Sequence, residues 1–206
     1  MHISEGVLPT WEIVTGWALT LPAVAYGVKK LEGEKLVLTA LLTALFFVAS
    51  LVHVPVGMGS AHLLFNGLIG LLLCEATFPA LFVGLFLQAV LFQFGGLGVL
   101  GVNTFNMAFP AIVACLLFRR WILSDGWKFY AGAFLSAFVA ILGAGLLVAL
   151  ELALAGERFL TDAKLIFLMH IPIATVEGIV YIFALRFIRR VYPQLLEDIG
   201  NRGGSL

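Results

Sequence analysis

The sequence is poor in charge, and what charge it has is balanced. The 206 residues include twelve Lys and Arg and twelve Asp and Glu, so charged residues make up 12% of the chain and the formal net charge is zero. A nucleic-acid-binding protein carries a basic surface, so this composition argues against a nucleic-acid partner. The remainder is unusually apolar, with 62% hydrophobic residues and a mean hydropathy of +1.08. The composition is that of a polytopic membrane protein.

Several other patterns are missing. Ten-residue segments of alternating hydrophobicity are absent, which disfavours a β-barrel. The glycine-rich stretch from Gly95 to Gly98 has no following Lys, so it is not a phosphate loop and no nucleotide should bind this chain. Only two cysteines occur, Cys74 and Cys115; they lie in apolar segments without metal-site spacing, and we expect them to be buried and inert.

The apolar residues form seven segments. A full membrane span needs roughly 20 residues, and the third segment reaches this length only if it borrows from Met58–Ala61 and Glu75–Thr77. The segments are about Trp11–Val28, Leu36–Val52, Leu63–Cys74, Phe78–Phe94, Val99–Phe118, Phe129–Ala155 and Leu165–Ile188. The predicted fold class is an all-α integral membrane protein with seven transmembrane helices.

The basic residues predict its orientation. With the N-terminus outside and the C-terminus inside, the outer loops hold only Arg158 and Lys164. The inner loops then hold the other ten: Lys29, Lys30, Lys35, Arg119, Arg120, Lys128, Arg186, Arg189, Arg190 and Arg202. This bias satisfies the positive-inside rule. We therefore expect one transmembrane domain over residues 1–206, in which residues 193–206 are a short, polar, frayed cytoplasmic tail.

The chain begins Met1-His2, and histidine at the second position disfavours removal of Met1. The α-amine, the His2 amide nitrogen and the His2 imidazole can close two fused chelate rings on one metal ion. A fourth nitrogen would complete a planar set that suits Ni(II), Cu(II) and low-spin Co(II). Met-His can also occur by chance, so the dipeptide alone does not establish a site. We interpret residues 1–10 as a metal-chelating segment that faces outside.

Three polar stretches interrupt the apolar background, where polar groups are costly and therefore informative. The stretch from His53 to His62 contains Pro55, Gly57 and Gly59, which break a helix, and continues to Asn66. His62 lies on the same side as His2 and is the preferred fourth ligand. His53 remains the alternative, and Ser60 and Asn66 are candidates for supporting the ligands.

The second stretch runs from Gly95 to Met107 and predicts a tight glycine loop that forms a lid over a buried N-terminus. Asn103 could cap the fifth helix, and Asn106 could hold the N-terminal segment by hydrogen bonds. The third stretch carries Glu177, an ionisable group in an apolar run that should have a partner, either polar side chains or the N-terminal segment. His170, in the same stretch, is most simply a structural residue of the helix.

These stretches together resemble the substrate-binding membrane subunit of cobalt and nickel energy-coupling-factor (ECF) transporters, the CbiM/NikM family. The resemblance covers nearly the whole chain and is carried by MHISEG, VPVGMGSAHLLFNG, FGGLGVLGVNTFNMAFP and HIPIATVEGIV. It implies seven transmembrane helices and a metal held by the Met1 amine, the amide and imidazole of His2, and a loop histidine that maps onto His62. The loop reads SAHLLFNG here and departs from the common SHPTG version.

The resemblance also implies a function and partners. The chain would be a non-enzymatic subunit in the cell inner (plasma) membrane that captures Co²⁺ or Ni²⁺, with a slight preference for cobalt. Its partners would be a scaffold membrane subunit, ATPase subunits and a small accessory membrane subunit. Ala40 and Ala44 form a small-xxx-small pattern through which the second segment could meet the scaffold.

Two other functions stay open on the residues alone. A small membrane enzyme would need a nucleophile–base pair, which the sequence does not display. A channel or a carrier for another small solute would need a ring of charges or a continuous polar stripe, which is also missing.

Overall fold

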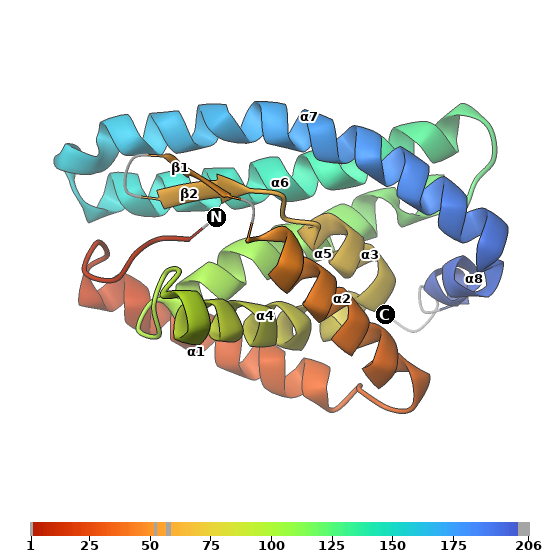
Figure 1. The fold of residues 1–206 in the computed structure, drawn as a ribbon, viewed down its shortest axis with the longest axis horizontal. Helices are drawn as coiled ribbons and strands as arrows, with labels where there is room; N and C mark the ends of the chain where they lie inside the picture. Colours follow the sequence, from red (N-terminus) through yellow and green to blue (C-terminus); the bar gives the residue numbers. More distant parts are fainter. Residues whose placement is uncertain (1, 52, 57–58, 202–206) are drawn as a thin grey trace.

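The computed structural model is a bundle of helices, and the long helices run roughly along the length of the molecule (Figure 1). It describes residues 2–51, 53–56 and 59–201, and for 53–56, 59–62, 198, 200 and 201 it describes the backbone alone. The elements are α1 Thr10–Val28, α2 Glu34–Ala49, β1 His53–Val56, β2 Gly59–His62, α3 Asn66–Leu73, a 3₁₀ turn Cys74–Ala76, α4 Thr77–Phe92, α5 Leu100–Ile122, α6 Trp127–Ala155, a 3₁₀ turn Glu157–Phe159, α7 Leu160–Val191 and α8 Pro193–Asn201.

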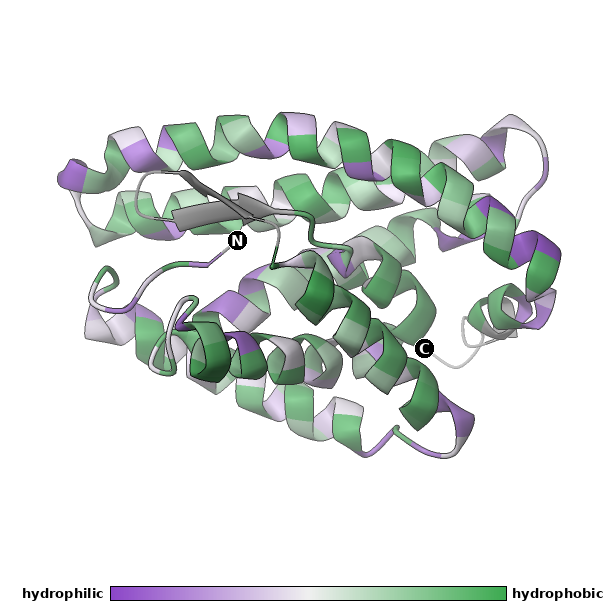
Figure 2. Ribbon diagram, viewed as in Figure 1, coloured by the Kyte–Doolittle hydropathy of each residue, from purple (hydrophilic) through white to green (hydrophobic). Residues whose placement is uncertain are grey.

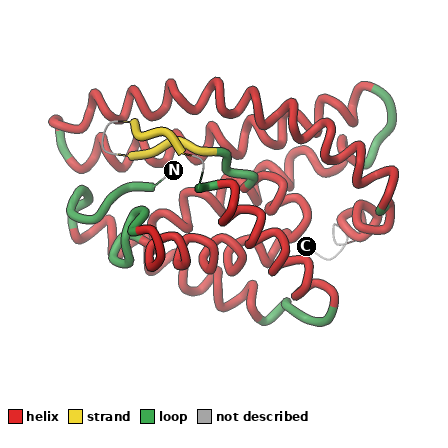
Figure 3. The backbone as a smooth tube through the Cα atoms, viewed as in Figure 1, coloured by secondary structure: helices red, strands yellow, loops and turns green. Residues whose placement is uncertain are grey.

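Helix α5 is the centre of the bundle. It packs against α1, α3, α4 and α6, while α7 lies along α6 and α2 lies along α4. Connections gather at the two ends, apart from the β1–β2 hairpin, which lies among the helices (Figure 3). Glycines with positive φ stand at several of these connections; Gly126 (φ 65°) precedes α6 and Gly156 (φ 145°) follows it.

The described chain is predominantly helical, which confirms the predicted all-α class. Within the described residues, four helical stretches are long and apolar enough to cross a membrane: Asn66–Phe92, Leu100–Ile122, Trp127–Ala155 and Glu157–Val191. The residues along these helices are mostly hydrophobic, and hydrophilic residues gather toward the helix ends (Figure 2). The chain is therefore a multi-pass membrane protein, and the count of seven spans stays a prediction.

The third predicted segment, Leu63–Cys74, differs most from the structure. Helix α3 has eight residues, which corresponds to about 12 Å of helix, too short to cross a bilayer. It does not extend back into Met58–Ala61, because β2 begins at Gly59. All its residues are buried, and it turns directly into α4 through Cys74, whose φ is +50°. Burial inside the bundle, rather than exposure to lipid, explains why so short a helix is so apolar.

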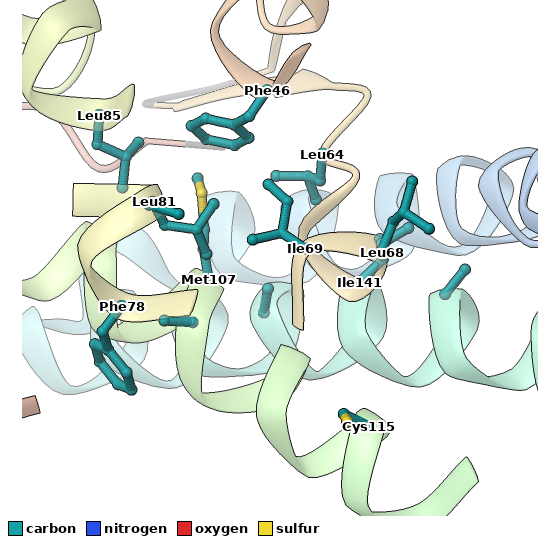
Figure 4. Close-up of a cluster of buried hydrophobic side chains, with 14 of the residues drawn as sticks. Phe46, Leu64, Leu68, Ile69, Phe78, Leu81, Leu85, Met107, Cys115 and Ile141 are labelled. Atoms are coloured by element: carbon teal, nitrogen blue, oxygen red, sulfur yellow. The ribbon is translucent and has the colours of Figure 1, made fainter. Parts of the chain in front are cut away.

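The core lies where α3, α4 and α5 meet. Figure 4 shows Phe46 of α2 and Leu81 and Leu85 of α4 pointing toward Met107 of α5 and Ile69 of α3. The core also reaches the last described helix, α8, where Leu196 and Ile199 are buried. Residues 193–201 are thus helical and packed onto the bundle, so the prediction of a frayed tail was wrong for these residues. Apolar side chains on one face of α8 explain why this segment packs.

Candidate metal centre

The N-terminal segment runs into the interior of the bundle. His2 is 4% exposed and Ile3 is 1% exposed, and Val7 and Leu8 also belong to the core. Apolar side chains at positions 3, 7 and 8 thus anchor a segment that has no helix or strand of its own. This burial explains how the beginning of a chain can hold a fixed position.

Asn103 fixes the backbone next to His2. The Ile3 N–H donates to Oδ1 of Asn103 (2.9 Å), and Nδ2 of Asn103 donates to the Ile3 carbonyl (3.1 Å). The residue lies in the first turn of α5, whose cap position is Val99, and in the described chain no side-chain hydrogen bond caps this position. The predicted capping role of Asn103 was therefore wrong. The side-chain amide of Asn103 instead hydrogen-bonds with both the N–H and the carbonyl of Ile3, and this orients the backbone next to His2.

The imidazole of His2 meets Gln88, a residue that the sequence reasoning missed. Nε2 of His2 lies 2.6 Å from Oε1 of Gln88, and Gln88 is fully buried on α4. When the proton is on Nε2, this contact is a hydrogen bond that the ring donates to the amide oxygen, and Nδ1 is then the ring nitrogen with the lone pair. The signal for Gln88 was present in the sequence, since a single amide in an apolar helix is costly unless it serves a purpose.

The glycine loop covers this segment as a lid, as the sequence predicts. The Glu5 N–H donates to the Gly95 carbonyl (3.0 Å), and the Gly98 N–H donates to Oε1 of Glu5 (2.5 Å). Gly95 and Gly96 have φ values of 77° and 130°, which favour glycine. A Cβ on Gly95 would stand 2.8 Å from Nδ2 of Asn103, and one on Gly96 would overlap the Glu5 side chain. Only glycine allows the lid to approach so closely.

The stretch from His53 to His62 forms an antiparallel hairpin. The sequence predicts non-helical backbone here, which is confirmed, but it does not predict strand pairing. His53 pairs with His62, and Ser60 pairs with Pro55. The side chains of His53, Ser60 and His62, as well as Met1, lie outside what the structure describes, so the predicted roles of these residues stay predictions.

Glu177 anchors the chain that leaves the hairpin. Its buried carboxylate accepts hydrogen bonds from the N–H groups of Leu64 and Phe65, the latter at 2.9 Å. The sequence predicts that Glu177 has a partner, either polar side chains or the N-terminal segment. The side chain of Tyr181 on the same helix also hydrogen-bonds with Glu177, so the prediction of a polar side-chain partner is confirmed, and the two backbone groups are further partners that it did not include. Asn66 follows directly and donates from Nδ2 to the Met107 carbonyl (3.0 Å). Glu177 and Asn66 thus position the segment next to His62.

Among the described residues, Asn106 forms no hydrogen bond with the N-terminal segment, contrary to the prediction. Its Nδ2 donates to Oε2 of Glu151 on α6 at 2.5 Å. Asn106 lies almost one turn further along α5 than Asn103, where the residue that it meets is Glu151 of α6 and not the N-terminal segment. Glu151 shares a cavity of about 170 Å³ with Glu12 of α1, whose two buried carboxylate oxygens have no hydrogen-bond partner among the described residues. Sequence reasoning missed both carboxylates.

The remaining titratable candidate is His170, on α7. Its Nδ1 lies 2.5 Å from the Ile166 carbonyl of its own helix, and its ring packs against Gly145 of α6. Within the described part of the chain, His, Cys, Asp and Glu side chains form no cluster of three or more that could hold a metal. A metal site at the N-terminus would therefore combine the His2 imidazole with main-chain nitrogens and with side chains of the hairpin.

The sequence matches one family over nearly its whole length. The family described as the cobalt uptake substrate-specific transmembrane region, CbiM, matches residues 2–195. A putative metal transport protein of Haemophilus influenzae is 40% identical over 207 residues, covering 98% of this chain and 99% of that protein. The cobalt transport protein CbiM of Anoxybacillus flavithermus is 30% identical over 223 residues, covering 100% of this chain and 89% of that protein.

Solved structures agree with these relatives. A crystal structure of a transition metal transporter superimposes with a TM-score of 0.82 at 27% identity and covers 93% of both chains. A truncated transition metal transporter gives the same TM-score at 25% identity, covering 92% of this chain and 99% of the other.

Proposed function

Because this chain belongs to the CbiM family of cobalt-uptake transmembrane subunits, we propose that it captures Co²⁺ or Ni²⁺ outside the cell and passes it inward as the substrate-binding subunit of an ATP-driven ECF importer. The family is a membrane component of a transporter, so the chain is not an enzyme. The metal is the cargo, and ATPase subunits bound through a scaffold membrane subunit supply the energy. A small accessory membrane subunit completes the complex.

The ligands in this proposal are the Met1 amine, the amide nitrogen and imidazole of His2, and the His62 imidazole. The contact between His2 and Gln88 carries the proposal, because a metal-binding histidine usually donates its other ring N–H to an oxygen acceptor. The proton on Nε2 leaves Nδ1 for the metal, the ring nitrogen that closes a six-membered chelate ring with the His2 amide. The Ile3 N–H is already bonded to Asn103, so chelation stops at His2.

The hairpin brings in the fourth ligand. Glu177 of α7 and Asn66, through its bond to α5, hold the chain just after His62. This support from two helices favours His62 over His53 as the fourth ligand. Ser60 precedes this ligand by two residues in the chain and would support it by hydrogen bonding.

A planar set of four nitrogens also explains selectivity. Mg²⁺ and Ca²⁺ prefer oxygen ligands and are rejected, whereas Co²⁺ and Ni²⁺ accept nitrogen ligands. We favour cobalt over nickel because cobalt is the metal in the descriptions of the family and of several relatives. A carrier for an uncharged solute would not need a buried N-terminal imidazole in a fixed tautomer.

The scaffold subunit would meet α2. Ala40 and Ala44 are exposed on this helix and line an apolar groove of about 450 Å³ between α2 and α4. Small residues let two helices approach closely in lipid, where packing rather than hydrophobicity drives association. A helix of the scaffold subunit would pack on this face. The chain would lie in the plasma membrane with its N-terminus outside and its C-terminus inside.

One added residue at the N-terminus tests the proposal. Glycine placed before Met1 moves the α-amine away and should abolish Co²⁺ and Ni²⁺ binding to the purified chain, measured by calorimetry and by metal analysis. Intact mass must show Met1 present and unblocked in the unextended protein. Full metal binding by the extended chain, or a processed N-terminus in the active protein, contradicts the proposal.

A further inference from the structure

A cavity of about 250 Å³ lies where α1, α5 and the break between α3 and α4 meet. The N-terminal segment and the lid lie beside the start of α5, whereas this cavity lies beside its end. Figure 4 shows one of the lining residues, Cys115, well along α5 from Met107. The lining residues are Ala23, Tyr26, Cys74, Glu75, Phe78, Ile112, Cys115, Leu116 and Arg119.

Arg119 gives the cavity a positive charge at one end. The other charged residue of the lining, Glu75, forms an ion pair with Lys35 at 3.2 Å, so these two charges cancel. Arg119 is half-buried in the last turn of α5 and forms no ion pair with any described residue. A second cation lies close by, since Nζ of Lys30 is 5.6 Å from the centre of the Tyr26 ring.

The walls of the cavity become apolar with distance from Arg119. Ile112, Leu116 and Arg119 are spaced four and three residues apart, so they lie on one face of α5. The seven residues from Ile112 to Arg119 correspond to about 10 Å of helix. The thiols of Cys74 and Cys115 lie 3.8 Å apart and hydrogen-bond to each other, and no disulfide joins them. These thiols therefore add little polarity to the apolar part of the lining.

A cation at the end of an apolar cavity fits an amphipathic anion. A guanidinium forms paired hydrogen bonds with phosphate oxygens, and an acyl chain fills an apolar cavity without losing hydrogen bonds. Basic pockets between transmembrane helices on the cytoplasmic side bind anionic lipid head groups. The cavity is at the end that the basic residues predict to face inside, where Lys29, Lys30, Arg119 and Arg120 lie. Its depth along α5 is within the half of a hydrocarbon core that is about 30 Å thick.

We propose that this cavity binds an anionic phospholipid of the inner leaflet. The phosphate lies on Arg119, and one acyl chain runs along Leu116 and Ile112. A lipid bound in this way joins α1 to α5 and to the start of α4. The site is independent of the N-terminal centre, so neither proposal depends on the other.

Native mass spectrometry of the full-length protein in detergent tests the role of charge. Phosphatidylglycerol and phosphatidylcholine with identical acyl chains are added at equal concentrations, and we expect the unmutated protein to bind phosphatidylglycerol more tightly. Arg119→Gln should lose about fivefold in affinity for phosphatidylglycerol, the effect of one basic residue beside an anionic lipid. Arg120→Gln should bind as the unmutated protein does. It is the matched control, because Arg120 is exposed on the same turn and lies outside the lining.

Leu116→Trp tests whether the acyl chain occupies the cavity. Leu116 and Leu117 are both exposed on α5, but only Leu116 lines the cavity. Leu116→Trp should therefore remove tight binding of phosphatidylglycerol, whereas Leu117→Trp should retain it, and circular dichroism checks that both variants fold.

The comparison of the two lipids on the unmutated protein needs no variant, and equal affinities there overturn the proposal. It is also overturned if the Arg119 and Arg120 variants lose affinity equally, since general surface charge would then explain the binding. Tight binding that persists in Leu116→Trp would place the acyl chain outside the cavity and would equally overturn it.

Discussion

Gln88 is one amide in the apolar helix α4, and its oxygen lies 2.6 Å from Nε2 of His2. A residue in this position orients the imidazole without touching the metal. Its effect on binding is therefore indirect, through the tautomer and the angle of the ring. Asn103 acts in the same way on the backbone of Ile3. At the scale of residues, the candidate centre consists of nitrogen ligands held by buried amides.

Replacing Gln88 with Leu should weaken Co²⁺ binding by about 10- to 100-fold, the usual cost of losing a supporting hydrogen bond to a ligand histidine. Isothermal titration of the purified variant measures the affinity. Gln194→Leu changes an exposed amide on α8 and serves as the matched control. Equal affinities in the Gln88 variant and the control would mean that the imidazole does not bind metal.

The four histidines should differ in how much their replacement by alanine reduces metal uptake. His2→Ala should abolish metal uptake by cells, because it removes an imidazole and frees the buried segment. His62→Ala should nearly abolish it by removing the fourth ligand. His53→Ala and His170→Ala should retain more activity, since His170 bonds within its own helix. Uptake of radioactive Co²⁺ measures all four. Loss of binding in the His53 variant with retention in the His62 variant would reverse our choice of fourth ligand.

Among the elements, the glycine lid and the hairpin frame the N-terminal segment. The lid is joined to Glu5 by two hydrogen bonds, and its glycines have dihedral angles that other residues rarely adopt. The hairpin is held at its exit by Glu177 of α7. The candidate centre is thus built from loops that the surrounding helices fix in place.

Gly96→Ala should displace the lid, because the new Cβ would overlap the Glu5 side chain. We expect a loss of metal affinity of about tenfold, or roughly 1.4 kcal/mol, which lies within the cost of strained backbone. Gly156→Ala is the control: its φ of 145° is similar, yet its Cβ would meet no atom within 4 Å. Titration with Co²⁺ compares the two, and an equal loss in both variants would show that backbone strain alone is responsible.

For the whole molecule, capture of the metal and coupling to partners use different regions. The candidate centre lies beside the start of α5, whereas the small residues Ala40 and Ala44 line a groove on the surface of α2 and α4. A change in this groove should therefore separate binding from transport.

Ala40→Trp and Ala44→Trp should leave Co²⁺ binding to the isolated subunit intact and should reduce transport by the full complex, because a bulky side chain keeps a partner helix at a distance. Leu45→Trp is the matched control, since Leu45 is exposed on the same helix outside the groove. Binding by the isolated subunit and uptake by reconstituted vesicles are measured in parallel. Loss of binding would place the face inside the fold, and unchanged transport would place it against lipid.

The helices and the lid were predictable because their signals are local. Apolar segments between basic loops determine where long helices lie, and α1, α4, α5, α6 and α7 begin and end within five residues of the predicted bounds. The glycines at 95 and 96 likewise indicate a close approach of backbone wherever they pack. The Met-His start and the helix-breaking stretch from 53 to 62 can be recognised from the sequence alone for the same reason.

Only the tertiary structure determined which polar groups meet. The pairs His2–Gln88, Asn103–Ile3, Asn106–Glu151 and Cys74–Cys115 join residues 41 to 100 positions apart. The hydropathy of each helix is the same whichever way it is rotated about its axis, so the sequence could not tell which polar side chain faces which. Packing around α5 sets that rotation. It therefore decides that Asn103 hydrogen-bonds with Ile3 and does not cap α5, and that the thiols of Cys74 and Cys115 lie in contact.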